Sequence, residues 1–206
     1  MLKLWGRTNS INVMKVIWTL EELKLPYERT NAGMQYGVVN EDFYKKMTPT
    51  SRVPTIEDEG FTLFESNAIV RYLAAKKGEA PFWPADLKAR ADADRWMDWA
   101  SMFLGPAMTP VFWQLIRTPA EKRSQQAIDE GIKATESIIA HLEPLLAARP
   151  YVGGDALTIG DISVGVYMHR WFALPIQRQP LPAVEAYYQR LLARPAYKQH
   201  VATALS

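Results

Sequence analysis

The feature that most constrains the fold is a change of pattern near residue 78. Before it, short strand signals alternate with helical periodicity; after it, strand signals nearly vanish and helical periodicity continues to the end. Residues 79–86 between them are rich in proline and poorly periodic, which is typical of a linker. We therefore expect an α/β domain over residues 1–78 and an all-α domain over residues 87–206.

The first domain is expected to follow the order βαβ-α-ββα. Apolar spacing from Val13 to Leu23 predicts a helix, which Pro26 ends, and the first strand, this helix and the second strand form a βαβ unit. The turn Asp58-Glu59-Gly60 suits a hairpin. Strands are expected at 3–5, 27–30, 54–58 and 61–64, a short helix within 32–50, and a helix at 66–76.

The second domain is expected to contain only helices. A long helical pattern covers 87–116, with Gly105-Pro106 and Pro110 bending or breaking it. A second pattern covers 119–147, with Pro119 in its first turn. Thr158 to Asp161 has the spacing of a capping box. Further helices are expected at 158–172, 182–193 and 195–204.

Composition excludes several kinds of chemistry. None of the 206 residues is cysteine, so disulfides and a protein thiol nucleophile are excluded, and any thiol must come from a ligand. The three histidines, His141, His169 and His200, lack metal-ligand spacing, so we expect no metal site. A net charge of +2 without a basic stripe disfavours nucleic acid. We also expect no membrane span and, since the N-terminus lacks the apolar core of a signal peptide, a cytoplasmic location.

Two short motifs predict a binding site in the first domain. Arg52-Val53-Pro54 opens a strand, and Glu65-Ser66 opens the helix that follows the hairpin. This order puts an extended backbone edge beside a helix N-terminus and a carboxylate. Such a combination favours a peptide-like ligand that carries both a carboxylate and an amine.

These motifs, together with residues 7–16 and the Thr158–Asp161 cap, resemble the cytosolic glutathione transferase family over essentially the whole chain. The resemblance implies a thioredoxin-like first domain and a cis Val53-Pro54 bond, although residue physics alone would predict trans. Two positions depart from the family pattern: Thr48-Pro49 replaces the usual Asn-Pro, and Ser51 the usual Gly.

The resemblance also implies how glutathione, the expected co-substrate, would bind. Ser66 and the helix N-terminus behind it would meet the γ-glutamyl carboxylate, and Glu65 would accept the γ-glutamyl ammonium. The backbone at Val53, before Pro54, would pair with the cysteinyl backbone, and Arg52 would contact the glycine carboxylate. The alternative for Ser66 is a plain helix N-cap.

The glutathione sulfur needs a group that stabilises its thiolate. A free thiol is only about 3% ionised at pH 7, and a hydrogen bond together with a helix N-terminus lowers its pKa. Thr8, Asn9, Ser10 and Asn12 lie in the appropriate window, which holds no tyrosine. The serine-type register set by Lys15 selects Ser10, and a branch with a Ser/Thr-x-Asn motif matches Ser10 and Asn12. Alternatively, either residue merely caps the first helix.

The second substrate is expected to be a small hydrophobic electrophile. The resemblance implies that it binds between the two domains, against the first long helix of the second one. For each candidate, packing in the core is the alternative role. The candidates are Phe103, Met108, Phe112, Trp113 and Trp171.

We therefore expect a homodimeric, cytoplasmic glutathione S-transferase that joins the glutathione thiolate to hydrophobic electrophiles in detoxification. One alternative is a glutathione-dependent disulfide reductase that uses oxidised glutathione. Another is a non-catalytic binding protein with the same fold. A hydrolase is disfavoured, because no G-x-S-x-G motif occurs and no histidine precedes His141.

Overall fold

The computed structural model describes residues 1–206 and divides the chain into two compact units, Met1–Glu79 and Ala80–Ser206. The division falls at the start of the segment predicted as a linker. The first unit is a mixed sheet with helices and the second is entirely helical, so the predicted fold class is confirmed. None of the helices is both long and apolar enough to cross a membrane.

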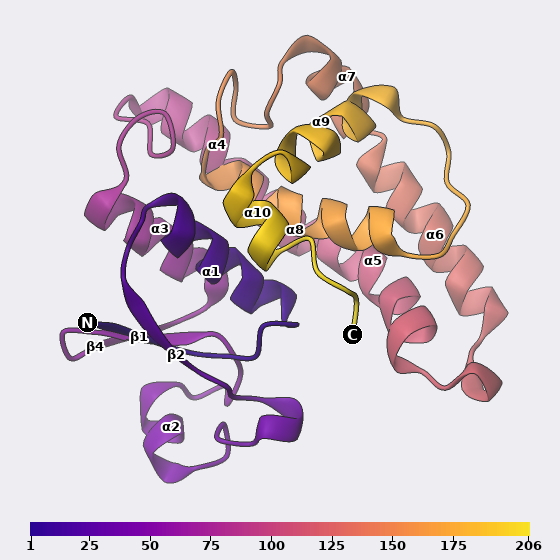
Figure 1. Ribbon diagram of the computed structural model, residues 1–206. Coiled ribbons are helices and arrows are strands. Elements are labelled where there is room, and N and C mark those ends of the chain that lie inside the picture. Colours follow the sequence, from indigo (N-terminus) through magenta and orange to yellow (C-terminus); the bar gives the residue numbers. More distant parts are fainter. The chain divides into compact units, whose positions relative to one another are not determined.

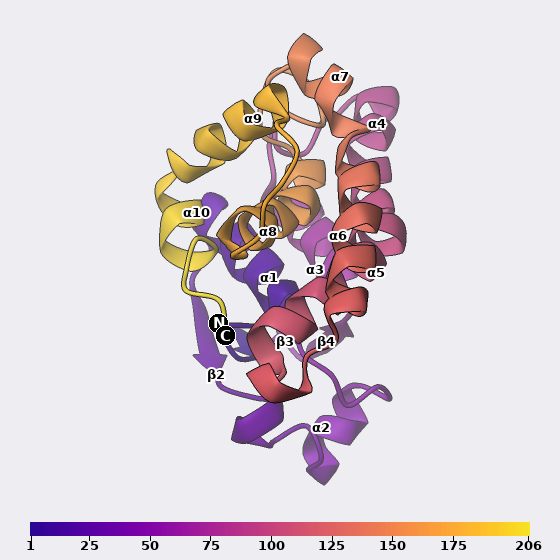
Figure 2. The ribbon, with the colours of Figure 1, turned by 90° about the vertical axis from the view of Figure 1, so that its right-hand side faces the viewer.

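The first unit is built on a four-stranded sheet in the order β2-β1-β3-β4. Strands β1 and β2 are parallel, whereas β3 is antiparallel to both β1 and β4. Helices α1 and α3 lie together over one face of the sheet, and α2 lies on the opposite side (Figures 1 and 2). The elements are β1 (Leu2–Trp5), α1 (Ile11–Glu22), β2 (Tyr27–Thr30), the 3₁₀ turn η1 (Met34–Tyr36), α2 (Asp42–Met47), β3 (Thr55–Asp58), β4 (Phe61–Phe64) and α3 (Ser66–Lys77).

Apolar side chains from the sheet, α1 and α3 form the core of this unit. The predicted apolar face of α1 is buried from Val13 to Leu20, where it meets Leu4 of β1 and Ile69 and Leu73 of α3. Burying this surface holds α1 and α3 against the sheet and against each other. The N-terminal ends of both helices therefore have defined positions.

The hairpin between β3 and β4 has the predicted two-residue turn. Asp58 pairs with Phe61, and both residues between them have positive φ, 54° at Glu59 and 87° at Gly60. Positive φ at both central positions is the type I′ geometry that matches the twist of paired strands. After the turn, β4 ends at Phe64, directly before Glu65 and the start of α3.

The second unit packs its helices around α8. Twelve of the fifteen residues of α8 are buried, and the other helices surround it (Figure 2). A helix that is apolar on nearly all sides belongs in the centre of a bundle. The elements are α4 (Leu87–Trp99), the π-helical turn η2 (Ala100–Leu104), α5 (Gly105–Phe112), the π-helical turn η3 (Trp113–Arg117), the 3₁₀ turn η4 (Ala120–Lys122), α6 (Gln125–Ile139), α7 (Leu142–Ala148), α8 (Ile159–Ala173), α9 (Pro182–Leu192) and α10 (Pro195–His200).

Several helix boundaries in this unit differ from the predictions. The first long helix is irregular where Gly105-Pro106 and Pro110 were expected to bend or break it, but it does not end there: it continues to Arg117 through π-helical turns on either side of α5. The pattern over 119–147 divides into α6 and α7. Pro119 does not start the next helix. That helix begins at Gln125, since the Ser124 side chain caps it by accepting a hydrogen bond from a backbone N–H. The last helix ends at His200 rather than residue 204.

The capping box at the start of α8 is confirmed. Thr158 is the N-cap residue, and both reciprocal hydrogen bonds with Asp161 are present. Asp161 is fully buried and also accepts hydrogen bonds from the backbone N–H of Val152 at 2.9 Å and the Tyr187 hydroxyl at 3.0 Å. Burial raises the pKa of Asp161 to about 6, although the bonds that its carboxylate accepts from Val152, from Tyr187 and from both the N–H and the hydroxyl of Thr158 act in the opposite direction.

Candidate functional site

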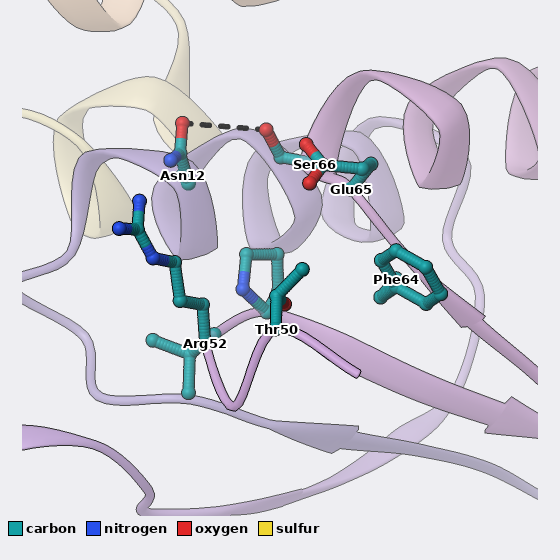
Figure 3. A pocket seen from close by; sticks show the side chains of 8 residues that line it. Asn12, Thr50, Arg52, Phe64, Glu65 and Ser66 are labelled. Carbon is teal, nitrogen blue, oxygen red and sulfur yellow. Dashed lines mark hydrogen bonds between the residues drawn. The ribbon is translucent and has the colours of Figure 1, made fainter. Parts of the chain in front are cut away.

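A pocket of about 90 Å³ lies in the first unit, where the N-terminal ends of α1 and α3 meet the loop before β3. Figure 3 shows Arg52, Thr50 and Phe64 on one side of it and Asn12, Glu65 and Ser66 on the other. The pocket thus contains a cation, a carboxylate, a hydroxyl and an amide. Its lining residues are Asn12, Thr50, Arg52, Val53, Pro54, Phe64, Glu65 and Ser66.

The start of α3 supplies two of these groups. The helix begins at Ser66, and Glu65 takes the N-cap position with φ 69° and ψ 111° and without a capping side-chain bond. A positive φ at a residue other than glycine costs about 1–3 kcal/mol, and such strain is typical of functional sites. The plain N-cap role does not apply to Ser66, which instead donates its hydroxyl to Asn12 Oδ1 at 3.3 Å.

The loop before β3 presents its backbone to the pocket. The Val53-Pro54 bond is cis, as the resemblance implied. Behind it, the fully buried Tyr44 donates its hydroxyl to the carbonyl of Arg52 at 2.7 Å and shares a hydrogen bond with Thr55 Oγ1 at 2.9 Å. Burial raises the pKa of Tyr44, so its hydroxyl keeps its proton at neutral pH. The loop carrying Arg52 and Val53 is therefore held from inside.

The two departures from the family pattern have a local explanation. Thr48 is buried, its hydroxyl lies 2.9 Å from that of Thr50, and it accepts a hydrogen bond from the Thr50 backbone N–H at 3.3 Å. A threonine can thus organise this turn with its side chain. Ser51 adopts φ 50°, the left-handed conformation in which glycine is usual. Thr48 and Ser51 thus shape the loop before β3 in this chain.

The structure separates the two residues predicted to stabilise the thiolate. Asn12 lines the pocket from the first turn of α1. Ser10 is the N-cap residue of α1, is 8% exposed and is not among the residues that line the pocket. The Ser10 side chain makes no capping hydrogen bond, so capping does not explain its hydroxyl.

The candidates for the electrophile site lie in the second unit and divide into two groups. Phe103 and Trp113 are each 50% exposed, in the π-helical turns η2 and η3. Met108, Phe112 and Trp171 are buried and belong to the core, so they have almost no free surface to offer a ligand. Core packing is the simpler role for these three residues.

Sequence reasoning missed two residues that line the pocket and one that supports it. Phe64 could have been found, since it ends β4 directly before Glu65. Thr50 carried no signal, because its place follows from the turn made by Thr48. Tyr44 was equally hidden, since it reaches the site by folding back from α2. No group of three or more histidine, aspartate or glutamate residues is placed to hold a metal ion.

Comparisons with known proteins agree with this geometry. Residues 1–75 match the model for the glutathione S-transferase N-terminal domain, and residues 125–190 match that for the C-terminal domain. Glutathione S-transferase GstB of Escherichia coli is 40% identical over 208 residues, covering both chains completely. A theta class glutathione S-transferase of Xanthomonas axonopodis pv. citri, solved with glutathione bound, is 38% identical with a TM-score of 0.96, covering 100% of this chain and 99% of that one. Glutathione transferase F7 of Populus trichocarpa is 25% identical with a TM-score of 0.87 and full coverage of both chains. The resemblance seen in the sequence is thus confirmed, and the chain belongs to the glutathione S-transferase family.

Proposed function

We propose that this protein is a glutathione S-transferase that binds glutathione in the pocket of the first unit. The observation that carries the proposal is the grouping of Arg52, the Val53 backbone, Glu65 and Ser66 around one cavity. The ligand needs a receptor for two carboxylates, an ammonium and a peptide backbone, and the pocket offers a complementary group for each. Two relatives that are named glutathione S-transferase and align with this chain over essentially their whole length support the same conclusion.

In this proposal each end of glutathione has its own partner. The γ-glutamyl carboxylate accepts hydrogen bonds from the Ser66 hydroxyl and from backbone N–H groups at the start of α3. Its ammonium pairs with Glu65, and the glycine carboxylate pairs with Arg52. The cysteinyl backbone pairs with Val53 as an added strand. The sulfur then lies near the N-terminal end of α1, where Asn12 and Ser10 are the candidate donors.

The reaction follows from the thiolate. Asn12 or Ser10 donates a hydrogen bond to the sulfur, the thiol proton leaves to solvent, and the anion is further favoured by the positive end of α1. The thiolate attacks an electrophilic carbon, a C–S bond forms, and the bond to the leaving group breaks with its electron pair. No covalent intermediate with the protein is involved. Phe103 and Trp113 are the proposed apolar contacts for the electrophile.

A second candidate function is the reduction of disulfides with glutathione. The observation that favours it is that Asn12, the asparagine of the Ser10-x-Asn12 match to the Ser/Thr-x-Asn branch, lines the pocket. The two functions differ in the ligand they prefer. A disulfide reductase would bind oxidised glutathione more tightly than reduced glutathione, whereas a transferase would show the opposite preference.

The thiolate absorbance of bound glutathione, titrated against pH, tests the proposal. We expect a thiolate band near neutral pH in the wild type that moves to higher pH in Asn12→Ala or Ser10→Ala, whichever residue donates to the sulfur. A shift in one variant alone assigns the donor. Binding without a thiolate band would favour the non-catalytic relative, and the absence of any glutathione binding would refute the transferase proposal.

Assembly and location belong to the same proposal. A homodimer, a cytoplasmic location and a role in detoxification are what membership of the family leads us to expect. Light scattering on the purified protein would test whether it is a homodimer, since this method measures the mass in solution directly. A mass of one chain at micromolar concentration would contradict the dimer.

A further inference from the structure

Lys15 is a buried lysine that the proposed reaction does not use. It lies in α1, and its side chain is only 1% exposed. Its Nζ donates a hydrogen bond to Asn67 Oδ1 at 3.2 Å. Lysine is almost never fully buried, because removing an ammonium group from water is costly unless hydrogen bonds compensate for it. The lysine therefore points to a specific role at the contact between α1 and α3.

Two hydrogen bonds, side by side, join the N-terminal ends of these helices. Asn12 and Lys15 are three residues apart, so they lie on the same face of α1. Their partners, Ser66 and Asn67, are consecutive residues in the first turn of α3. The Asn12–Ser66 bond faces the pocket (Figure 3), whereas Lys15 and Asn67 do not line it.

The bond between Ser66 and Asn12 is sensitive to small movements. Its length, 3.3 Å, is already longer than the roughly 2.5–3.0 Å usual for an O–H···O bond, so the bond is weak and a shift of a few tenths of an ångström breaks it. Apolar packing of Val16 and Ile17 against Ile69 holds the two helices together. Such packing is not directional, whereas a hydrogen bond restricts how α3 slides and rotates.

We propose that Lys15 is a positioning residue for the glutathione pocket: by holding Asn67 it fixes the first turn of α3, and so keeps Ser66 beside Asn12 in the place from which its hydroxyl, which donates to Asn12 in the free protein, turns to the γ-glutamyl carboxylate. The inference rests on the proposed function, since glutathione is the ligand whose γ-glutamyl end meets Ser66. Lys15 itself touches neither the substrate nor the sulfur. Its effect passes through Asn67 to the residues that do.

The test combines two single variants and their double variant. Lys15→Met keeps a straight apolar side chain of similar length but removes the donor, and Asn67→Leu removes the acceptor. Lys77→Met is the matched control, because it removes an exposed lysine from the last turn of α3. For each protein, calorimetry gives the dissociation constant of glutathione, and absorbance gives the pKa of its bound thiol.

We expect Lys15→Met and Asn67→Leu each to weaken glutathione binding about three- to tenfold, the effect of losing one hydrogen bond. Both should also raise the pKa of the bound thiol, a change that loss of stability alone would not produce. The double variant should be no worse than either single variant, since both interrupt one link. Lys77→Met should match the wild type.

Three results would overturn the inference. The first is a Lys15→Met variant that binds glutathione as tightly as Lys77→Met. The second is a double variant in which the two single losses of affinity multiply. The third is an Asn67→Leu variant that binds glutathione like the wild type. The comparison of Asn67→Leu with the wild type remains informative if Lys15→Met does not fold, because Asn67 is only partly buried and its replacement disturbs the core less. If the wild type shows a thiolate band but the variants do not differ, only the inference fails; if the wild type binds no glutathione, the proposed function fails with it.

Discussion

Replacing Asp161 with alanine removes a carboxylate that accepts four hydrogen bonds at the start of α8. Two come from the backbone N–H groups of Val152 at 2.9 Å and Thr158 at 2.8 Å. The others come from the hydroxyls of Thr158 at 3.1 Å and Tyr187 at 3.0 Å. Asp161 and Tyr187 are fully buried, so no solvent replaces the carboxylate when it is removed.

The expected cost is the difference between two opposing contributions. Leaving the two N–H groups and the Tyr187 hydroxyl without an acceptor costs about 1–3 kcal/mol each, or roughly 6 kcal/mol together. Burial raises the pKa of Asp161 to about 6, so keeping the carboxylate ionised at pH 7 already costs roughly 3 kcal/mol, at about 1.4 kcal/mol per pH unit. We therefore expect Asp161→Ala to lower the free energy of unfolding by about 3 kcal/mol at pH 7, and Tm by roughly 6–12 °C.

The same reasoning predicts the direction of the pH dependence. The pKa of Asp161 is higher in the folded than in the unfolded protein, where it is about 3.9. Its contribution to stability is therefore fully present below about pH 4 and is lost as the pH rises through about 6. The gap in stability between wild type and Asp161→Ala should widen on acidification, towards roughly 6 kcal/mol near pH 4.

Urea unfolding followed by circular dichroism, at pH 4.5 and pH 7, measures both effects. Asp155→Ala is the matched control, since Asp155 is exposed in the loop that leads to α8. A loss below about 1 kcal/mol at pH 7, close to the range for surface substitutions, would show that the Asp161 carboxylate does not hold the start of α8. A gap that narrows as the pH falls would contradict the direction of the pKa shift.

Two further predictions concern the first unit. Asp58 accepts hydrogen bonds from the Tyr72 hydroxyl at 2.7 Å and from Lys76 Nζ at 2.5 Å. Burial alone would raise the pKa of Asp58, but these bonds outweigh that effect and hold the pKa below its ordinary value. Asp58→Asn should therefore lower the free energy of unfolding by about 1–2 kcal/mol at pH 7. The loss should be smaller below pH 4, because the stability contributed by a carboxyl group with a lowered pKa disappears as the pH falls. Urea midpoints of both proteins at the two pH values would measure the difference. Ser66→Ala should raise KM for glutathione roughly tenfold or more, through loss of a hydrogen bond to a charged group, with a smaller change in kcat; steady-state kinetics that show an unchanged KM would contradict the role of Ser66.

The order of elements in the first unit could be predicted because each element has a local cause. Apolar spacing from Val13 to Leu20 predicts α1, and the turn at Glu59 and Gly60 predicts the hairpin. Prediction was weaker in the second unit, because helix boundaries there depend on packing and on caps. The single pattern over 119–147 divides into α6 and α7, and Ser124 rather than Pro119 caps the start of α6.

The family, the fold class and most of the residues that line the pocket could be predicted from the amino-acid sequence. Arg52, Val53 and Pro54 lie in one short motif and Glu65 and Ser66 in another, so their chemistry could be read without coordinates. Their neighbours along the chain define each motif. The hairpin between the two motifs pairs Thr55 with Phe64 and so brings both motifs to the same end of the sheet.

Which residue near the start of α1 lines that pocket depends on packing between elements that are distant in the sequence. Asn12 meets Ser66 across 54 positions of sequence, and Lys15 meets Asn67 across 52. Nothing in the local pattern distinguishes Asn12 from Ser10, since both are good helix caps. The choice follows from how α1 is rotated against α3, and that rotation is set by apolar packing contributed from distant parts of the chain.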